Sequence, residues 1–186
     1  SLYNQSSTHA SCINAIVQAI TGDGLVTENE EILDKANTEG ESWNDIFNKA
    51  ALDYKLFGGY ALEIIYSRDR SKIAEVYHVD FSHVRAMEKD DRNKIPGYYI
   101  SSEWKPVWDF TIQSDKHKLP HLPPFNLFKK GDEPKQLLYH NPYRPGQGYY
   151  PLPDYVAGSK VIDLDQEVDN FHISNIKNGL APSLAI

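Results

Sequence analysis

Residues 42–66 read SWNDIFNKAALDYKLFGGYALEIIY, and this stretch decides the fold class. Ser42 and Asp45 lie three positions apart, as in a capping box in which Asp replaces the usual Glu, so a helix is predicted to begin here. Its apolar side chains recur at helical spacing and form a stripe wide enough to dock on a sheet: Trp43, Ile46, Phe47, Ala50, Ala51 and Tyr54. The glycine pair 58–59 breaks the helix, and residues 60–66 are apolar and β-branched, as in a strand.

The segments that follow predict more short strands. Residues 73–79 are expected to form a hairpin or a neighbouring strand with 60–66, around the charged turn 67–71. Further strands are predicted at 84–87, 97–100, 107–112 and 137–140. Prolines at 120, 123 and 124 predict an extended loop or a sheet edge over 116–126, because proline cannot donate to a ladder. The pattern predicts an α+β fold: a small mixed or antiparallel sheet with amphipathic helices packed on it.

On the N-terminal side, residues 7–20 predict an amphipathic helix. Apolar residues recur there mostly at three and four positions: Ala10, Ile13, Ile16, Val17 and Ile20. The hydroxyl residues 6–8 are N-cap candidates, and Thr-Gly-Asp-Gly at 21–24 is a stop signal. Cys12 is the one cysteine, so it cannot form an internal disulfide, and its apolar neighbours predict an inert core thiol. Residues 28–41 are acidic and predict a solvated face or an ordered linker.

Near the C-terminus, residues 153–178 predict a helix about 39 Å long. Pro153 near its start and Gly179 just past its end fit the usual asymmetry of helix termini. One apolar stripe is formed by Val161, Leu164, Val168 and Phe171. The flank carries Asp163, Asp165, Glu167 and Asp169. Because these are spaced by two, they form two pairs on nearly opposite sides, Asp163 with Glu167 and Asp165 with Asp169.

Composition excludes several classes of protein. The formal net charge of −7 argues against tight binding to a phosphate backbone, which needs clustered Lys and Arg. No stretch approaches the roughly 20 apolar residues of a membrane span, and the first thirty residues lack the pattern of a secretion signal. The chain begins with Ser1 and ends on an apolar run, which predicts a piece of a longer protein.

No group of residues forms a recognisable active site in the sequence. His117 and His121 have the spacing of helical metal ligands, but Pro120 between them makes a helix improbable. Residues 163–167 resemble a calcium loop without its glycine and its terminal Glu, and they lie within helical periodicity. Glycine-rich phosphate loops and a nucleophile elbow are missing too. We therefore expect no enzyme, no cofactor and no metal site.

Several short motifs, taken in order, resemble the portal proteins of tailed bacteriophages. The sequence Leu-Leu-Tyr-His-Asn-Pro at 137–142 resembles the family's strand that ends in His. Gly-Tyr-Tyr-Pro-Leu-Pro at 148–153 resembles the loop before its long helix, and Asn-Gly-Leu-Ala-Pro at 178–182 resembles the end of that helix. Phe-Gly-Gly-Tyr-Ala at 57–61 and Tyr-His-Val-Asp at 77–80 are similar to its preceding turn and strands.

The resemblance implies a fold, a function and partners. Residues 1–150 would be a wing-like α+β domain, and residues 151–186 the first stem helix and the start of the clip. The whole protein would form a ring of twelve subunits at one capsid vertex, through which double-stranded DNA passes with weak, non-specific contact. Terminase, capsid or scaffolding proteins and head-tail connector proteins would be its partners. The protein would belong to the virion and assemble in the bacterial host cytoplasm, with no membrane involved.

On this interpretation the C-terminal helix carries the function. One acidic pair would line the channel and keep phosphates from binding, although a merely solvated helix face explains the same charges. The apolar stripe at 161, 164, 168 and 171 would pack between adjacent stem helices or under the wing, and would meet a different surface on the next subunit.

Two other functions remain open. One is a stand-alone α+β domain that binds a ligand or hydrolyses a substrate with His78, Asp80 and His83. The portal resemblance implies instead that these three residues are structural. The other is a carbohydrate-binding module, suggested only by the 12 Tyr and 3 Trp.

Overall fold

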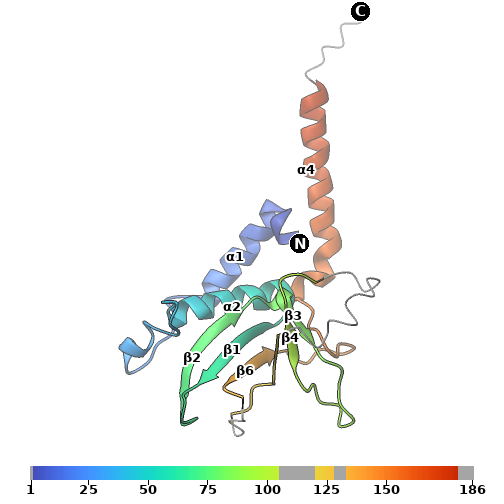
Figure 1. The fold of residues 1–186 in the computed structure, drawn as a ribbon. Helices are drawn as coiled ribbons and strands as arrows, with labels where there is room; N and C mark the ends of the chain where they lie inside the picture. The colour runs from blue at the N-terminus through green and yellow to red at the C-terminus, as the bar shows by residue number, and fades with distance from the viewer. Residues whose placement is uncertain (1, 105–119, 128–132, 180–186) are drawn as a thin grey trace, which may run out of the picture.

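A computed structural model describes residues 2–104, 120–127 and 133–179 and has an α+β fold (Figure 1). Its long helices are α1 (Ser7–Thr21), α2 (Trp43–Phe57) and α4 (Ser159–Gly179). The strands are β1 (Tyr60–Tyr66), β2 (Ile73–Val79), β3 (Val84–Ala86), β4 (Tyr98–Ile100), β5 (His121–Leu122) and β6 (Lys135–His140). The short 3₁₀ turns are η1 (Leu2–Asn4), η2 (Glu30–Ile32), η3 (Phe81–His83) and η5 (Asp154–Gly158). The predicted α+β class is confirmed.

Both sheets are small and antiparallel. The first has the order β2-β1-β6, and the second has the order β3-β4-β5. The hairpin of β1 and β2 is the one predicted, and β5 lies at a sheet edge, as the prolines before and after it required. The predicted strand at 107–112 lies outside the described residues.

Helix α2 covers the first sheet and begins at the predicted capping box. The Asp45 backbone N–H donates to Ser42 Oγ at 3.1 Å, and the Ser42 N–H donates to Asp45 Oδ2 at 2.9 Å. The helix ends at Gly58, whose φ of 84° is in the left-handed region. Ile46 and Ala50 are buried toward the sheet, so the predicted stripe does dock there.

The core lies between α2 and the sheets, in two clusters. One contains Ala36, Ile46, Ile64 and Val76. The other contains Ala61, Phe81, Val84, Tyr98 and Leu137, and partly buried Tyr139 packs against it. The ring of Tyr139 stacks on Phe81 and Tyr98 at centroid distances of 5.0 and 4.7 Å, and burial raises the pKa of both tyrosines. This aromatic stack joins β6 to β4 and therefore the two sheets.

Helix α1 begins at the predicted residue, ends at Thr21, one residue beyond the predicted end, and packs on α2. Ser6 is its N-cap, since its side chain accepts the His9 backbone N–H at 3.0 Å. Ile13 is buried, but Cys12 is exposed. The prediction of a core thiol is therefore wrong, because Cys12 lies about 100° around the helix from Ile13 and away from α2.

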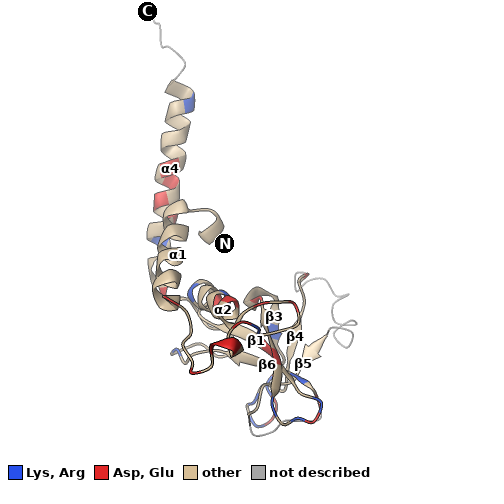
Figure 2. Ribbon diagram, turned by 90° about the vertical axis from the view of Figure 1, so that its left-hand side faces the viewer, with Lys and Arg blue, Asp and Glu red and all other residues tan. Residues whose placement is uncertain are grey.

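The C-terminal part of α4 extends beyond the rest of the chain in both views, whereas its lower part lies near the N-terminal end of α1 (Figures 1 and 2). The sequence predicted one continuous helix from Pro153, but its first turn is the 3₁₀ turn η5, and α4 begins at Ser159. It continues through Gly179, one residue beyond the predicted end. Its 21 residues give a length of about 31 Å.

Candidate functional site

Helix α4 presents its apolar stripe to solvent. The exposed fractions are 70% for Val161, 62% for Leu164, 45% for Val168 and 63% for Phe171. No residue of α4 is buried, so no described part of its own chain covers the stripe. The sequence predicted that these side chains pack under the wing or between subunits; the first arrangement is not seen, and the second stays a prediction. A stripe spaced three, four, three is typical of a helix that packs along another helix.

The four acidic residues of α4 form the two predicted pairs on nearly opposite sides of the helix. Asp163, Glu167 and Asp169 are exposed, and Asp165 is half-buried. None of the four forms an ion pair within the described part of the chain, and red patches mark the helix in Figure 2. Residues 163–167 are helical, which excludes the conformation of a calcium loop.

The base of α4 is held by contacts from three parts of the chain. Asp154 in η5 pairs with Lys55 of α2 at 3.0 Å and with Arg144 at 3.2 Å. The Tyr155 hydroxyl donates to the Leu56 carbonyl at 3.0 Å, and the Tyr155 ring meets the His9 ring edge-on at a centroid distance of 4.5 Å. These contacts fix where α4 leaves the body of the chain.

Glycines at the end of α2 allow the segment before η5 to pack closely. A Cβ on Gly58 would overlap the Leu152 carbonyl, and one on Gly59 would overlap the His140 carbonyl. The Pro151 ring also lies beside Gly59. The glycine pair therefore ends α2 and also seats the chain that leads into α4.

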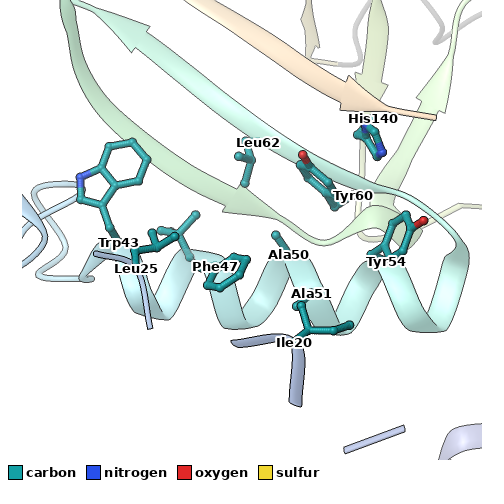
Figure 3. A pocket seen from close by; sticks show the side chains of 11 residues that line it. Ile20, Leu25, Trp43, Phe47, Ala50, Ala51, Tyr54, Tyr60, Leu62 and His140 are labelled. Atoms are coloured by element: carbon teal, nitrogen blue, oxygen red, sulfur yellow. The ribbon is translucent and has the colours of Figure 1, made fainter. Parts of the chain in front are cut away.

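An apolar groove of about 420 Å³ lies between α2, β1 and the C-terminal end of α1 (Figure 3). Trp43, Phe47 and Tyr54 of α2 line it, which are the members of the predicted stripe that stay half-buried. Tyr60 and His140 stack at its end with a centroid distance of 4.8 Å. Ile20 and Leu25 border the groove and remain 45% and 37% exposed. The stripe of α2 therefore does two things: it docks on the sheet and it leaves an open apolar surface.

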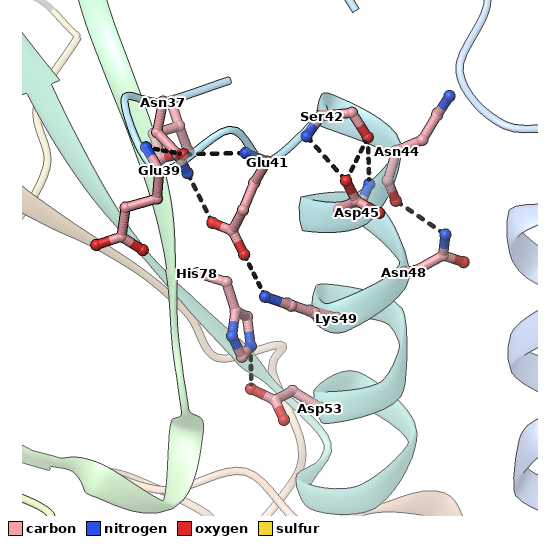
Figure 4. A network of polar contacts seen from close by, with 11 residues as sticks. Asn37, Glu39, Glu41, Ser42, Asn44, Asp45, Asn48, Lys49, Asp53 and His78 are labelled. Carbon is pink, nitrogen blue, oxygen red and sulfur yellow. Dashed lines mark hydrogen bonds and ion pairs between the residues drawn. The ribbon is translucent and has the colours of Figure 1, made fainter. Parts of the chain in front are cut away.

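His78 belongs to a buried polar network that the sequence did not predict (Figure 4). Its Nε2 lies 2.8 Å from Asp53 Oδ2, and the same oxygen accepts the Phe81 backbone N–H at 3.1 Å. Asp53 is only 7% exposed. It lies on the buried face of α2, three residues after Ala50 and seven after Ile46. A carboxylate at that position of an apolar face was the signal that could have revealed it.

The second part of this network joins α2 to the acidic linker. The Asn37 side chain, 1% exposed, donates to Glu41 and, at 3.1 Å, to the Val76 carbonyl. Glu41 also pairs with Lys49, and hydrogen bonds from Lys49 and Asn37 lower its pKa. The segment 28–41 is thus held by polar contacts, which agrees with the predicted ordered linker.

His78 and Asp80 line one pocket of about 640 Å³ together with Asp53, and His83 is not among the residues that line it. Burial acts to raise the pKa of Asp80, but the hydrogen bonds from Ser82 outweigh it and lower the pKa. Asp80 accepts the Ser82 backbone N–H at 2.8 Å and so caps η3. His83 Nε2 lies 3.9 Å from Asp80 Oδ2, while His78 turns to Asp53. His78 therefore pairs with Asp53 and His83 lies near Asp80, and the alternative function that uses all three residues stays a prediction.

No cluster of metal ligands occurs in the part of the chain that the structure describes. Within 2–104, 120–127 and 133–179, no three His, Cys, Asp or Glu side chains gather around a common point. His121 is exposed on β5, and His117 lies outside the described residues. None of the described helices has the length and apolar character to cross a membrane.

Comparison with known proteins leaves the geometry of the chain as the guide to its function. No family model matches the chain, and no curated protein matches it.

Proposed function

We propose that this chain is part of a structural subunit of a tailed-phage portal ring, which forms the DNA channel at the capsid vertex. The observation that carries the proposal is α4, a helix of 21 residues that leaves the α+β body with its apolar stripe uncovered. An exposed stripe of this kind marks a surface for another protein. In a ring, each subunit would supply one such helix to its neighbours around a central hole. The resemblance of residues 137–182 to portal proteins is the reason to propose a portal ring in particular.

The proposed ring would contain twelve copies and would belong to the virion, after assembly in the host cytoplasm. Terminase, scaffolding or capsid proteins and the head-tail connector would bind it at different stages. DNA would pass through without specific contact. The net charge of −7 fits this role, since a channel that bound phosphates tightly would stall the DNA.

The acidic pairs of α4 give the proposal a direct test. The double variants Asp163→Lys with Glu167→Lys, and Asp165→Lys with Asp169→Lys, each change the charge by the same amount on opposite sides of the helix. We expect one double variant to lower the DNA packaged per head at least about tenfold, because Lys residues that face the channel bind phosphates. The other should package nearly as well as the wild type. The amount of protected DNA per purified head measures the effect.

The two double variants are controls for one another. Size-exclusion chromatography must first show that both assemble as the wild type does. If both then package normally, the acidic pairs have no role in the channel. If both fail equally although they assemble, the loss does not come from one channel-facing side.

A further inference from the structure

Helix α1 has three different faces. His9, Ile13 and Thr21 are buried on the first face. The second face is exposed and polar and carries Ser7, Ser11, Asn14 and Gln18. The third face is exposed but apolar and carries Cys12, Ala15, Ile16 and Ala19. The helix contains no Lys, Arg, Asp or Glu, although 24% of the chain is charged. Absence of charge on an exposed face is typical of the centre of a protein interface.

The apolar face of α1 continues into the apolar groove. Ile20 follows Ile16 by one helical turn and lines the groove, and Leu25 borders it just after α1 ends. The two features therefore make one surface, the α1 surface, formed by the apolar face of α1 and the groove. It is open in the described part of the chain.

We infer that the α1 surface binds α4 of a second copy of this chain. Four apolar side chains of α4 lie at positions i, i+3, i+7 and i+10, which is how a helix enters an apolar groove. They are large, whereas Cys12, Ala15 and Ala19 are small and let another helix approach closely. The stripe rises about 15 Å along α4, within the length of about 22 Å of α1.

Charge favours α4 over the other possible occupants. Helix α4 carries Asp163, Asp165, Glu167 and Asp169 against Lys160 and Lys177, so two α4 helices that pair with each other bring like net charges together. The uncharged α1 imposes no such cost. Pairing of two α1 surfaces with each other would close as a dimer and leave both α4 stripes uncovered.

The contact must join two copies. In its own chain α4 is fixed at its base by Asp154 and Tyr155 and leaves its apolar stripe exposed, although its lower part lies near the N-terminal end of α1 (Figures 1 and 2). Binding of α4 to a different surface on the next copy is a heterologous contact, which builds a ring. The inference rests on the proposed function for the formation of a ring. It adds that the α1 surface is the surface that the neighbour's stem helix contacts.

Native Cys12 allows a test by cross-linking in the intact gene product, with any other cysteine replaced by serine. One tagged copy keeps Cys12, and an untagged copy carries Cys12→Ser with Leu164→Cys. Each chain then has one thiol of the pair, so a link made by a short bismaleimide between Cys12 and the thiol introduced by Leu164→Cys must join two copies. The control replaces Leu164→Cys by Asn170→Cys, an exposed position on the other side of α4. We expect at least about fivefold more linked dimer with Leu164→Cys than with Asn170→Cys, because a short link forms only between thiols that lie close together. Peptide mass spectrometry identifies the linked pair.

Each outcome decides the inference. Links between two Leu164→Cys chains, in place of links from Cys12 to Leu164→Cys, would show that α4 pairs with α4 and would overturn the inference. Rings in which Cys12 is not linked to the Leu164→Cys chain would also overturn it. If no rings form, the portal proposal fails. The inference about the α1 surface then stands only if smaller complexes still give the link between Cys12 of one copy and the Leu164→Cys chain. Monomers that give no link would overturn both.

A second pair of variants tests the same surface without cysteines. Ala19→Glu places a carboxylate at the centre of the apolar face of α1, and Gln18→Glu places one about 100° around the helix, on the polar face, with an equal added charge. Both positions are exposed, so neither variant should unfold the chain. We expect Ala19→Glu to lower the fraction of assembled protein about tenfold or more and Gln18→Glu to leave it unchanged, since a buried unpaired carboxylate is costly. Equal assembly of the two variants would overturn the inference.

Discussion

Replacement of Gly58 by alanine is expected to lower the free energy of unfolding by about 3 kcal/mol or more. Two causes add. The φ of 84° is in the left-handed region, which costs an L-residue about 1–2 kcal/mol. The new Cβ would also overlap the Leu152 carbonyl, and overpacking of this kind costs about 1–3 kcal/mol. Urea denaturation followed by circular dichroism measures the change.

Gly146 offers a matched control for this variant. Its φ of 80° imposes the same backbone strain, but a Cβ there would meet nothing within 4 Å. Gly146→Ala should therefore cost only about 1 kcal/mol. The difference between the two variants reports the close packing of the chain that leads into α4. Equal losses would contradict the role given to Gly58 in seating α4.

Replacement of Asp53 by alanine is expected to cost about 3 kcal/mol. The variant removes the acceptor of the Phe81 backbone N–H and the partner of His78, and it leaves both polar groups in a buried site. A buried group left without its partner costs about 1–3 kcal/mol, and more when the broken contact is charged. The measurement is again the urea midpoint, with the slope of the transition checked for change.

Asp80→Ala is the control for Asp53→Ala. Asp80 is exposed and caps the short turn η3, so its loss should cost about 1 kcal/mol or less. A larger loss for Asp80 than for Asp53 would show that the polar network is not what joins α2 to β2 and η3.

The elements that local chemistry determines could be predicted from the sequence. The capping box of Ser42, the break at the glycine pair and the hairpin of β1 and β2 depend on residues close together in the chain. Helical spacing also located α1 and most of α4. In each case, residues close together in the sequence favour one local backbone conformation.

Features that depend on distant packing were not predicted. The partner of His78 is Asp53, which lies 25 residues away in another element, whereas sequence proximity suggested Asp80. Cys12 is exposed because α2 covers only one face of α1, and apolar neighbours in the sequence cannot show which face that is. The turn η5 replaces the start of the predicted helix where Asp154 is held by Lys55 and Arg144.

The candidate site was predicted only in part. Periodicity identified the stripe and the acidic pairs of α4, and the structure shows that the stripe is uncovered. The groove could not be foreseen, because it requires α1, α2 and β1 to be placed together. The surface proposed to meet α4 is therefore a product of the tertiary fold, and only the helix that would bind it is readable from the sequence.

Ring assembly is the central claim, and negative-stain electron microscopy of the intact gene product tests it most directly. The account predicts closed rings of about twelve copies with a central hole, formed alone or with scaffolding protein, since heterologous contacts that close generate rings. A preparation that stays monomeric at high concentration, even when scaffolding protein is present, would contradict the account.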